Sequence, residues 1–274
     1  MNINKIVNYF ILRPLYEIII ILSKFFSGKS FTVIYNLLSF ISFNNKYIKF
    51  QNGCFHVMDN KKKWFFSHKT RAWIYFKGLK HRNIELSTEY LMHKVPIKKN
   101  DIIIDCGANV GDFYLCFDKK IRYIGIEPSS KEFFALKKNI KNQTLINKAL
   151  WKEQGKKTFY VSSEDADSSL IEINKYEKKL KVDTITLDNI LKKNNQRIKL
   201  LKLEAEGAEP EILEGCKKIN LIDYITIDAG FERGKLLEST LVPCINYLNK
   251  KNFELIGYSN TRVVVLFKNK NMNK

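Results

Sequence analysis

Beyond residue 101, the chain alternates short apolar runs with longer segments in which apolar residues recur at helical spacing. The short runs predict buried strands, and the longer segments predict helices between them. The predicted strands are Ile102–Asp105, Tyr123–Glu127, Thr144–Ile146, Ile198–Glu204, Ile222–Asp228, Phe253–Tyr258 and Val263–Lys268. The predicted helices are 110–118, 130–141, 187–194, 208–217 and 236–250. This alternation predicts an α/β fold with a parallel, doubly wound sheet and ligands at the carboxyl ends of its strands.

Two segments depart from this alternation. Residues 156–186 form an insertion with an additional strand, KKTFYV, and a loop rich in Ser and Asp. The last two predicted strands are separated only by a turn at Ser259 and Asn260, so they predict a closing antiparallel hairpin.

The N-terminal segment, residues 1–45, is predicted to be helical and apolar. Its two apolar stretches, 6–26 and 31–43, are either interrupted by charged residues or short. A membrane-spanning helix needs about 20 mostly uncharged residues, so neither stretch predicts a span. Two apolar helices beside a Lys-rich region suit peripheral contact of residues 1–43 with the inner face of a membrane. Packing on the main domain, or a dimer contact, is the alternative.

Residues 46–96 form a basic and aromatic region before the main domain, 97–274. Asn52-Gly53 predicts a hairpin, Asp59-Asn60 a turn, and 83–93 a helix. The aromatic residues could stack on bases or sugar rings, or they could form the core of a small β unit, which we favour. The N-terminal extension is therefore expected to be α+β.

The net charge of +19 is concentrated at the N-terminus, where residues 1–100 carry 17 Lys and Arg against four Asp and Glu. The excess indicates either an anionic partner or compositional drift, since Arg occurs only seven times in the chain. The five cysteines form no C-x-x-C pair, and no cleavable signal peptide is evident, so a cytoplasmic location is expected.

A glycine loop follows the first predicted strand in Asp105-Cys-Gly-Ala-Asn-Val-Gly111. Its G-x-x-x-G spacing differs from both the dinucleotide fingerprint and the phosphate loop, so by itself it is weakly specific. The next strand ends in Glu127, where an acid can accept both hydroxyls of a ribose. A ribose site without a phosphate site favours S-adenosylmethionine over NAD. The alternative is that Glu127 caps the following helix.

These motifs, in this order, resemble the FkbM family of class I methyltransferases over residues 84–268. The matching segments are D-C-G-A-N-V-G (105–111), I-G-I-E-P (124–128), N-K-A-L (147–150), S-S-L (168–170), T-I-T-L-D (184–188) and L-L-K-L-E-A-E-G-A-E (200–209). The resemblance implies a Rossmann-like, seven-stranded sheet and S-adenosylmethionine as cofactor. The implied cofactor contacts are Asp105, Gly107, Ala108, Asn109, Gly111, Glu127, Pro128 and Asn147. Family members usually have Asp-x-Glu-Gly where this chain has Glu204-Ala-Glu206-Gly207.

Methyl transfer to a hydroxyl requires alignment of the reacting atoms and a proton acceptor. All four histidines precede the glycine loop, so the acceptor is a carboxylate, a histidine from the N-terminal region, or water. Glu204 is the first candidate, followed by Glu206 and Asp228. Ser168 and Ser169 either bind the substrate or make ordinary loop hydrogen bonds. No cluster has the spacing of metal ligands.

The sequence therefore predicts an S-adenosylmethionine-dependent O-methyltransferase. The resemblance implies an acceptor hydroxyl on a sugar, a glycan or a natural-product precursor. RNA methylation through the basic N-terminal region is an alternative that the scarcity of Arg disfavours. A non-catalytic cofactor-binding scaffold at a membrane surface is another, which the intact glycine loop and Glu127 disfavour.

Overall fold

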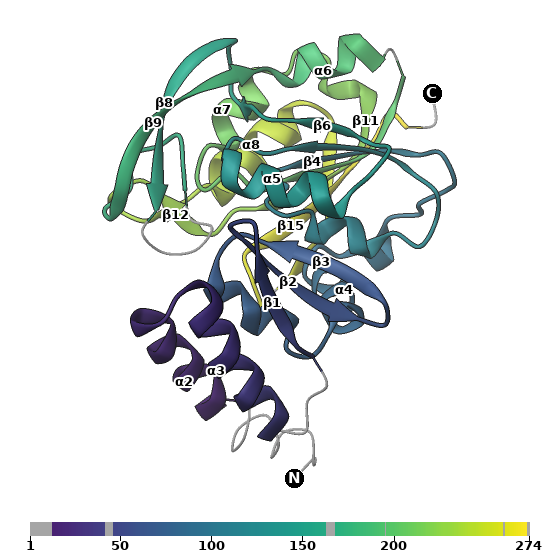
Figure 1. Cartoon of the computed structure of the whole chain (residues 1–274). Helices are drawn as coiled ribbons and strands as arrows, with labels where there is room; N and C mark the ends of the chain where they lie inside the picture. Colours follow the sequence, from purple (N-terminus) through teal and green to yellow (C-terminus); the bar gives the residue numbers. More distant parts are fainter. Residues whose placement is uncertain (1–12, 42–45, 163–167, 195, 260, 273–274) are drawn as a thin grey trace.

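A seven-stranded sheet forms the centre of the molecule, in a computed structural model that describes residues 13–41, 46–162, 168–194, 196–259 and 261–272. Its strand order is β14-β15-β11-β10-β4-β5-β6 (Figure 1). The strands are β4 (Ile102–Cys106), β5 (Arg122–Ile126), β6 (Thr144–Ile146), β10 (Ile198–Leu203), β11 (Ile222–Asp228), β14 (Phe253–Ser259) and β15 (Val264–Asn269). All seven predicted strands are confirmed within a residue or so at each end.

The strand directions confirm the predicted topology. β6, β5, β4, β10 and β11 are parallel neighbours, whereas β15 pairs antiparallel with both β11 and β14. The chain moves outward from β4 through β5 to β6, and then returns to start the other half at β10. The order thus reverses between β4 and β10, which is where open α/β sheets bind ligands. Of the turn predicted between β14 and β15, Asn260 lies outside the described residues.

Helices cover both faces of the sheet, because alternate residues of each buried strand point to opposite sides. Ile102 and Ile104 join a core with α6 (Leu187–Asn194), α7 (Glu209–Glu214) and α8 (Leu241–Lys250). Ile103, between them, packs on the other face. Its neighbours there come from α4 (Leu79–Glu89) and α5 (Ser130–Asn139).

Several predicted helices are shorter than expected. The segment predicted as helix 110–118 is a 3₁₀ turn, η4 (Asp112–Cys116), because its apolar side chains pack in more than one direction. Phe113 contacts both Tyr90 and Phe117, while Tyr114 contacts Tyr123.

The other corrections have causes that the structure shows directly. The predicted helix 208–217 ends at Glu214, because Gly215 is packed against the backbone of Lys152. The helix expected over 236–250 starts only at Leu241, because β13 (Glu238–Ser239) pairs with β12 (Phe231–Arg233). The helix expected over 83–93 is α4, followed by η3 (Met92–Lys94).

A three-stranded antiparallel sheet lies below the main sheet and belongs to the N-terminal region (Figure 1). Its strands are β1 (Ile48–Gln51), β2 (Cys54–Asp59) and β3 (Lys62–Phe66), so both predicted turns are confirmed. A 3₁₀ helix, η2 (Lys69–Tyr75), follows. Trp64, Phe66 and Tyr75 are fully buried, which supports the core interpretation of these aromatic residues.

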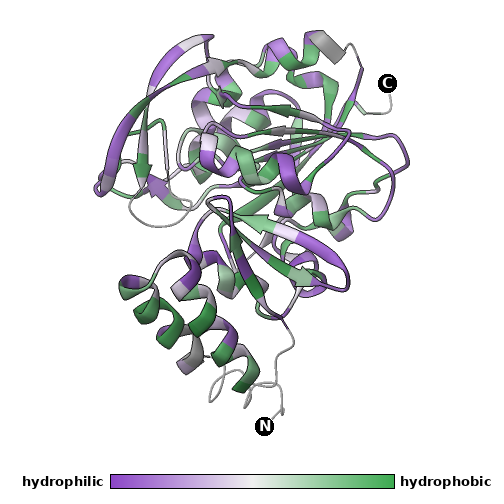
Figure 2. Cartoon of the chain, viewed as in Figure 1, coloured by the Kyte–Doolittle hydropathy of each residue, from purple (hydrophilic) through white to green (hydrophobic). Residues whose placement is uncertain are grey.

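Two apolar helices, α2 (Arg13–Phe25) and α3 (Gly28–Ile41), complete the described N-terminal part (Figures 1 and 2). Their inner face is buried against β1–β3, with Ile19, Phe31 and Tyr35 in the shared core. The inner face of these helices thus packs on β1–β3 and η2 of the N-terminal region, whereas the alternative expected it to pack on the main domain. Residues 1–12 and 42–45 of the predicted segment lie outside the described residues.

The insertion forms an arm beside the main sheet. Its long strands β8 (Gly155–Ser162) and β9 (Tyr176–Ile185) pair antiparallel, and β7 (Ala149–Leu150) adds a short parallel strand to β9. The strand KKTFYV lies in β8, as predicted, whereas β9 was not predicted. Part of the Ser- and Asp-rich loop, 163–167, lies outside the described residues.

Candidate functional site

The glycine loop joins β4 to η4 and exposes its backbone to a pocket. Gly107 has a φ of +69°, and a Cβ at this position would overlap the carbonyl oxygen of Glu204. Gly111 has a φ of +93°, and a Cβ there would lie 2.7 Å from Ile140 Cδ1. Both positions therefore require glycine, but for different reasons: Gly107 permits the approach of β10, and Gly111 permits the packing of α5.

A pocket of about 580 Å³ opens beside this loop, at the carboxyl ends of β4, β5 and β10. This volume is within the range of small-molecule sites. It brings together nine of the predicted site residues, namely Asp105, Gly107, Ala108, Asn109, Glu127, Pro128, Ser168, Glu204 and Glu206. Four predicted residues do not line it, namely Gly111, Asn147, Ser169 and Asp228.

Glu127 follows β5 and directs its carboxylate to the glycine loop. The carboxylate accepts hydrogen bonds from the backbone N–H groups of Asn109 (2.9 Å) and Ser129 (2.8 Å). The Ser129 contact satisfies part of the helix-capping alternative. A carboxylate has about four acceptor positions, so two remain for hydroxyls of a ligand in the pocket. Burial, reinforced by the nearby charge of Glu132, raises the pKa of Glu127 to about 8.

Asn109 also bears on cofactor binding. Its side-chain oxygen is buried and has no hydrogen-bond partner among the described residues. Such a group is costly to leave unpaired unless a ligand or water satisfies it. Together with the two free acceptor positions of Glu127 and the side-chain-free backbone at Gly107, it fits a bound nucleoside that donates hydrogen bonds.

Two predicted residues outside the pocket hold its loops in place. Asn147 donates from Nδ2 to the carbonyl oxygens of Glu127 (2.8 Å) and Pro128 (3.1 Å). Ser169 donates from Oγ to the carbonyl oxygen of Glu206 (2.7 Å). Both therefore act on residues that do line the pocket.

A buried lysine links the first and fourth strands of the predicted series. Sheet register places Lys202 of β10 beside Asp105 of β4. Its Nζ lies 3.1 Å from Asp105 Oδ1 and 2.7 Å from Glu204 Oε2. It also donates to the carbonyl oxygen of Gly107 at 2.9 Å. Lys202 thus fixes the glycine loop and Glu204 relative to each other, and these contacts satisfy a charge that would otherwise be costly to bury.

Glu204 has more partners than any sequence pattern suggested. Besides Lys202, it accepts hydrogen bonds from Tyr90 OH (2.7 Å) and Arg262 Nη2 (2.8 Å). Arg262 also pairs with Asp228. Burial alone would raise the pKa of Glu204, but the charges of Lys202 and Arg262 hold it well below its usual range. A carboxylate with so low a pKa is a weak base.

The N-terminal region supplies one wall of the pocket. The residues that line it from η2, from α4 or from positions next to these helices are His68, Arg71, Ile74, Arg82, Leu86 and Tyr90. A histidine from the N-terminal region was one of the predicted proton acceptors, and His68 is a histidine of this region that lines the pocket. The other residues of this wall could not be predicted from the sequence, because they contact pocket residues that lie tens of positions away in the chain.

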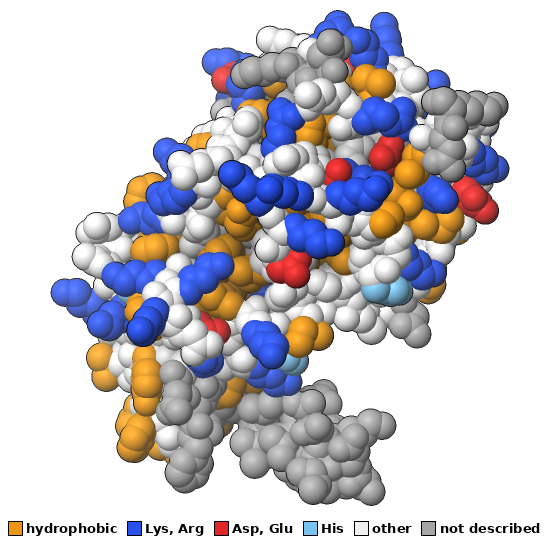
Figure 3. Space-filling model, turned by 90° about the vertical axis from the view of Figure 1, so that its right-hand side faces the viewer, with side chains coloured by type: hydrophobic (Ala, Val, Ile, Leu, Met, Phe, Trp, Pro, Cys, Tyr) orange, Lys and Arg blue, Asp and Glu red, His pale blue; other side chains and the backbone are white. Residues whose placement is uncertain are grey.

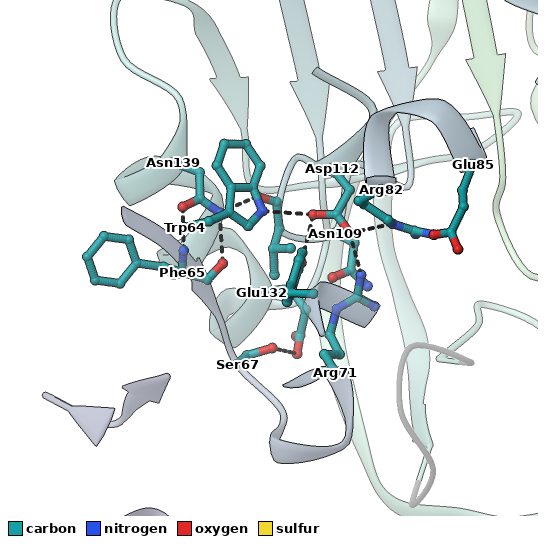
Figure 4. A network of polar contacts seen from close by, with 12 residues as sticks. Trp64, Phe65, Ser67, Arg71, Arg82, Glu85, Asn109, Asp112, Glu132 and Asn139 are labelled. Atoms are coloured by element: carbon teal, nitrogen blue, oxygen red, sulfur yellow. Dashed lines mark hydrogen bonds and ion pairs between the residues drawn. The ribbon is translucent and has the colours of Figure 1, made fainter. Parts of the chain in front are cut away.

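Asp112 anchors this wall to the glycine loop (Figure 4). Its carboxylate receives four hydrogen bonds: Trp64 Nε1 (2.8 Å) and Tyr75 OH (2.7 Å) at Oδ1, and Arg71 Nη2 (3.0 Å) and Arg82 Nε (3.2 Å) at Oδ2. Although burial opposes ionisation, the two arginines hold the pKa of Asp112 below its usual value. The network therefore joins β3, η2 and α4 to the start of η4.

A second set of bonds ties β3 to α5. The side chain of Asn139 accepts from the backbone N–H of Phe65 (2.7 Å), and donates to the carbonyl oxygens of Phe65 (2.8 Å) and Val110 (2.7 Å). Ser67 donates to Glu132 at 2.7 Å (Figure 4). Within the described residues, no group of three or more His, Cys, Asp or Glu is arranged to hold a metal ion.

Comparisons with known proteins give one sequence match and several structural ones. The sequence model of the methyltransferase FkbM domain matches residues 105–254. No curated protein matches the chain significantly.

Among solved structures, the chain is similar to magnesium protoporphyrin IX methyltransferase from Synechocystis PCC 6803, with a TM-score of 0.40 and 7% identity over 74% of this chain and 83% of that one. It is also similar to ribosomal protein L11 methylase from Lactobacillus delbrueckii subsp. bulgaricus, with a TM-score of 0.38 and 10% identity over 69% and 79% of the two chains. An rRNA methylase from Streptococcus thermophilus gives a TM-score of 0.38 and 13% identity over 68% and 96%.

Proposed function

Since the chain belongs to the FkbM family of S-adenosylmethionine-dependent methyltransferases, we propose that it methylates a hydroxyl group of a sugar, a glycan or a natural-product precursor. The observation that carries this proposal is the set of carboxylates at one side of the pocket, Glu204, Glu206 and Glu232. A hydroxyl must lose a proton during methyl transfer, and carboxylates can accept it or stabilise the change in charge.

The two sides of the pocket suit two different ligands. In the sheet, β4 separates β5, which precedes Glu127, from β10, which precedes Glu204. Because neighbouring strands are about 4.8 Å apart, these carboxylates lie on opposite sides of the glycine loop. We assign the cofactor ribose to Glu127 and its neighbour Asn109, and the acceptor to the side of Glu204. When bound, S-adenosylmethionine supplies a methyl group activated by the sulfonium.

The arm gives the acceptor a second wall. Phe159 and Leu180 line the pocket from β8 and β9, and Ser168 lines it from the loop between them. Apolar surface with a hydroxyl beside it can pack on the ring of a sugar while bonding its substituents. Ser168 Oγ accepts a hydrogen bond from the backbone N–H of Ser162 at 3.0 Å, so the hydroxyl proton of Ser168 is available to a ligand.

The test is the transfer of labelled methyl from S-adenosylmethionine to a fractionated extract of the source cells. We expect label in a product that resists ribonuclease and protease and releases an O-methylated sugar or alcohol on hydrolysis. Glu127→Ala is the matched control, since it should lose transfer with the fold intact. Label in RNA or on nitrogen would contradict the proposal. Stacking on RNA already lacks support from Trp64, Phe66 and Tyr75, because all three are buried.

We further infer that the outer face of α2 and α3 contacts an anionic membrane surface. Eight large apolar side chains are exposed on or between these helices: Ile18, Ile21, Phe25, Phe26, Val33, Leu37, Phe40 and Ile41. Their spacing places them on one side of each helix, opposite the buried side. An apolar face of this size marks an interaction surface rather than an ordinary solvent-exposed helix.

The charge around this face favours an anionic surface over another apolar one. Lys24 and Lys29 are exposed near the junction of the two helices, and Lys69 donates to the carbonyl oxygen of Phe26 at 3.0 Å. Figure 3 shows Lys and Arg side chains in excess over acidic ones, with apolar side chains at the lower end. Within the described residues, no helix has both the length and the apolar composition required to cross a bilayer. Contact would therefore be peripheral.

Vesicle co-sedimentation tests this inference. The full chain should bind vesicles that contain about 30 mol% phosphatidylglycerol, because this anionic lipid gives the vesicle surface a negative potential. It should bind vesicles of pure phosphatidylcholine only weakly. Replacing Val33, Leu37 and Phe40 by Ser should lower binding about tenfold or more. The matched control replaces Ile84, Phe134 and Leu255, which are exposed elsewhere. The inference is wrong if the variant with Ser at 33, 37 and 40 binds vesicles as well as the wild type. It is also wrong if these substitutions dissociate a dimer of the chain but leave vesicle binding intact.

A further inference from the structure

A third carboxylate faces the acceptor side of the pocket, and no sequence motif pointed to it. Glu232 lies in β12, directly after the end of β11, and lines the pocket. Alternation along β12 explains its direction. Arg233, the next residue, pairs with Glu211 of α7 at 2.7 Å, and Phe231 is 67% exposed. Glu232 therefore points away from both, into the pocket.

Glu232 belongs to a cluster with more negative than positive charge. A Cβ placed on Gly230 would lie 3.3 Å from Glu232 Oε1 and 3.5 Å from Asp228 Oδ1, so the two carboxylates converge over this glycine. Arg262 compensates Glu204 and Asp228, which it contacts directly. Among the described residues, no hydrogen bond or ion pair is formed by the carboxylate of Glu232. It is thus the member of the cluster whose charge is least compensated.

We propose that Glu232 is the general base that removes the proton from the acceptor hydroxyl. This assignment rests on the proposed O-methyl transfer. The acceptor hydroxyl gives its proton to Glu232 as its oxygen bonds to the methyl carbon. The carbon–sulfur bond breaks with its electron pair left on sulfur, so the sulfonium charge is cancelled. The proton then passes from Glu232 to water.

The surroundings of Glu232 suit a base that works near neutral pH. The charged groups that face it are Asp228 at the end of β11, Glu204 after β10, Arg262 before β15 and Glu209 of α7. Burial, followed by the charges of Asp228 and Glu204, raises the pKa of Glu232 to about 7, while Arg262 opposes the rise. Glu204 lacks this property because its cations keep it ionised. Its role is to position Tyr90 and Arg262 and to balance Lys202.

The first experiment measures protonation without an acceptor. The full chain, labelled with ¹³C at the glutamate carboxyl carbon and saturated with S-adenosylhomocysteine, is titrated by NMR. A resonance that is absent from Glu232→Gln should titrate near pH 7, well above an ordinary glutamate. Titration of that resonance near pH 4.5, about the usual value, would overturn the assignment.

The second experiment measures transfer to the acceptor fraction of the extract. Glu232→Gln should lower the rate at least about 100-fold. It should also remove the fall in rate below pH 7. The dissociation constant of S-adenosylhomocysteine should stay within about twofold, since Glu232 is not among the residues assigned to the cofactor. Glu238→Gln, an exposed acid on the partner strand β13, should behave as wild type.

The outcomes separate this proposal from the proposed function. If the wild-type chain methylates a hydroxyl and Glu232→Gln does so equally fast, the assignment to Glu232 is wrong while O-methylation stands. A rate lost in Glu206→Gln but kept in Glu232→Gln would overturn it in the same way. If the wild-type chain transfers methyl only to nitrogen or RNA, the proposed function fails first.

Discussion

Asp112 is a buried acid beside the glycine loop, and a second set of buried or half-buried acids lies at the acceptor side of the pocket. They differ in how fully their charge is compensated. Asp112 receives four hydrogen bonds, two of them from arginines. In the other group, Arg262 pairs with Glu204 and Asp228, and Lys202 pairs with Glu204, whereas Glu232 pairs with neither cation. The first arrangement joins two parts of the chain, whereas the second leaves one carboxylate able to exchange a proton.

The comparison shows that burial alone does not make an acid reactive. Asp112 and Glu232 both lose hydration, yet the pKa of Asp112 falls and that of Glu232 rises to about 7. The difference is the number of donors within reach, because each donor stabilises the ionised form. Compensated acids of this kind hold structure together, and partly compensated acids in a pocket are candidates for chemistry.

Removing the compensated charge should have the largest effect on stability. Asp112→Asn leaves Arg71 and Arg82 without their buried partner, so the free energy of unfolding should fall by about 3–5 kcal/mol. Urea denaturation followed by circular dichroism measures this loss. Glu85→Gln is the control, since it breaks only the exposed pairs with His81 and Arg82 and should cost about 0–1 kcal/mol. A loss below about 1 kcal/mol in Asp112→Asn would mean that the network does not join the two parts.

Glu127 tests the cofactor side of the pocket. Glu127→Ala should weaken S-adenosylhomocysteine binding by about 1.5–3 kcal/mol, because charged hydrogen bonds to the ribose hydroxyls are lost. Calorimetric titration gives the dissociation constant directly. Asp118→Asn, an exposed acid that follows η4, should bind with wild-type affinity. Equal affinity in wild type and Glu127→Ala would leave Glu127 only its helix-capping role.

The pH dependence of binding should come from the same residue. The pKa of Glu127 is about 8 without ligand, and donation by ribose hydroxyls favours the ionised form. Affinity for S-adenosylhomocysteine should therefore rise severalfold from pH 6 to 8. One proton can change the affinity by at most about tenfold per pH unit, which is ~100-fold over this range. Calorimetry across this range, with Glu127→Gln as the comparison, checks it. A steep rise that persists in Glu127→Gln would assign the proton to another group.

A smaller effect separates one hydrogen bond from simple packing. Trp64→Phe removes one of the four donors to Asp112, whereas Trp151→Phe removes a buried indole N–H with no hydrogen-bond partner among the described residues. Trp64→Phe should destabilise the chain by about 1.5 kcal/mol more than Trp151→Phe, which is the lower end of the range for one hydrogen bond to a charged group. The difference is measured from the midpoints of urea denaturation, provided that the unfolding free energy of both variants depends equally on urea concentration. Identical losses would show that the remaining three donors suffice.

Local pattern was sufficient for most of the fold and for the cofactor side of the site. Apolar runs such as 102–105 and 222–228 predict buried strands, because a strand covered on both faces needs apolar residues throughout. The glycines at 107 and 111 and the acid at 127 lie within one strand–loop–helix–strand unit, so sequence spacing reports their spatial order. Helix lengths were less well predicted, since Gly215 ends α7 through its contact with the distant Lys152, and the pairing of β12 with β13 delays the start of α8.

The sequence by itself determined the seven strands, the glycine loop and the family, because these depend on residues close together in the chain. Only the tertiary structure decided which acids are compensated. Asp112 meets Trp64 across 48 positions, and Glu204 meets Tyr90 across 114. The pKa of an acid depends on the charges and donors around it in space, and sequence distance does not encode those. Glu204, the acid that the sequence favoured as base, is therefore held ionised, and Glu232 is the acid left to accept a proton.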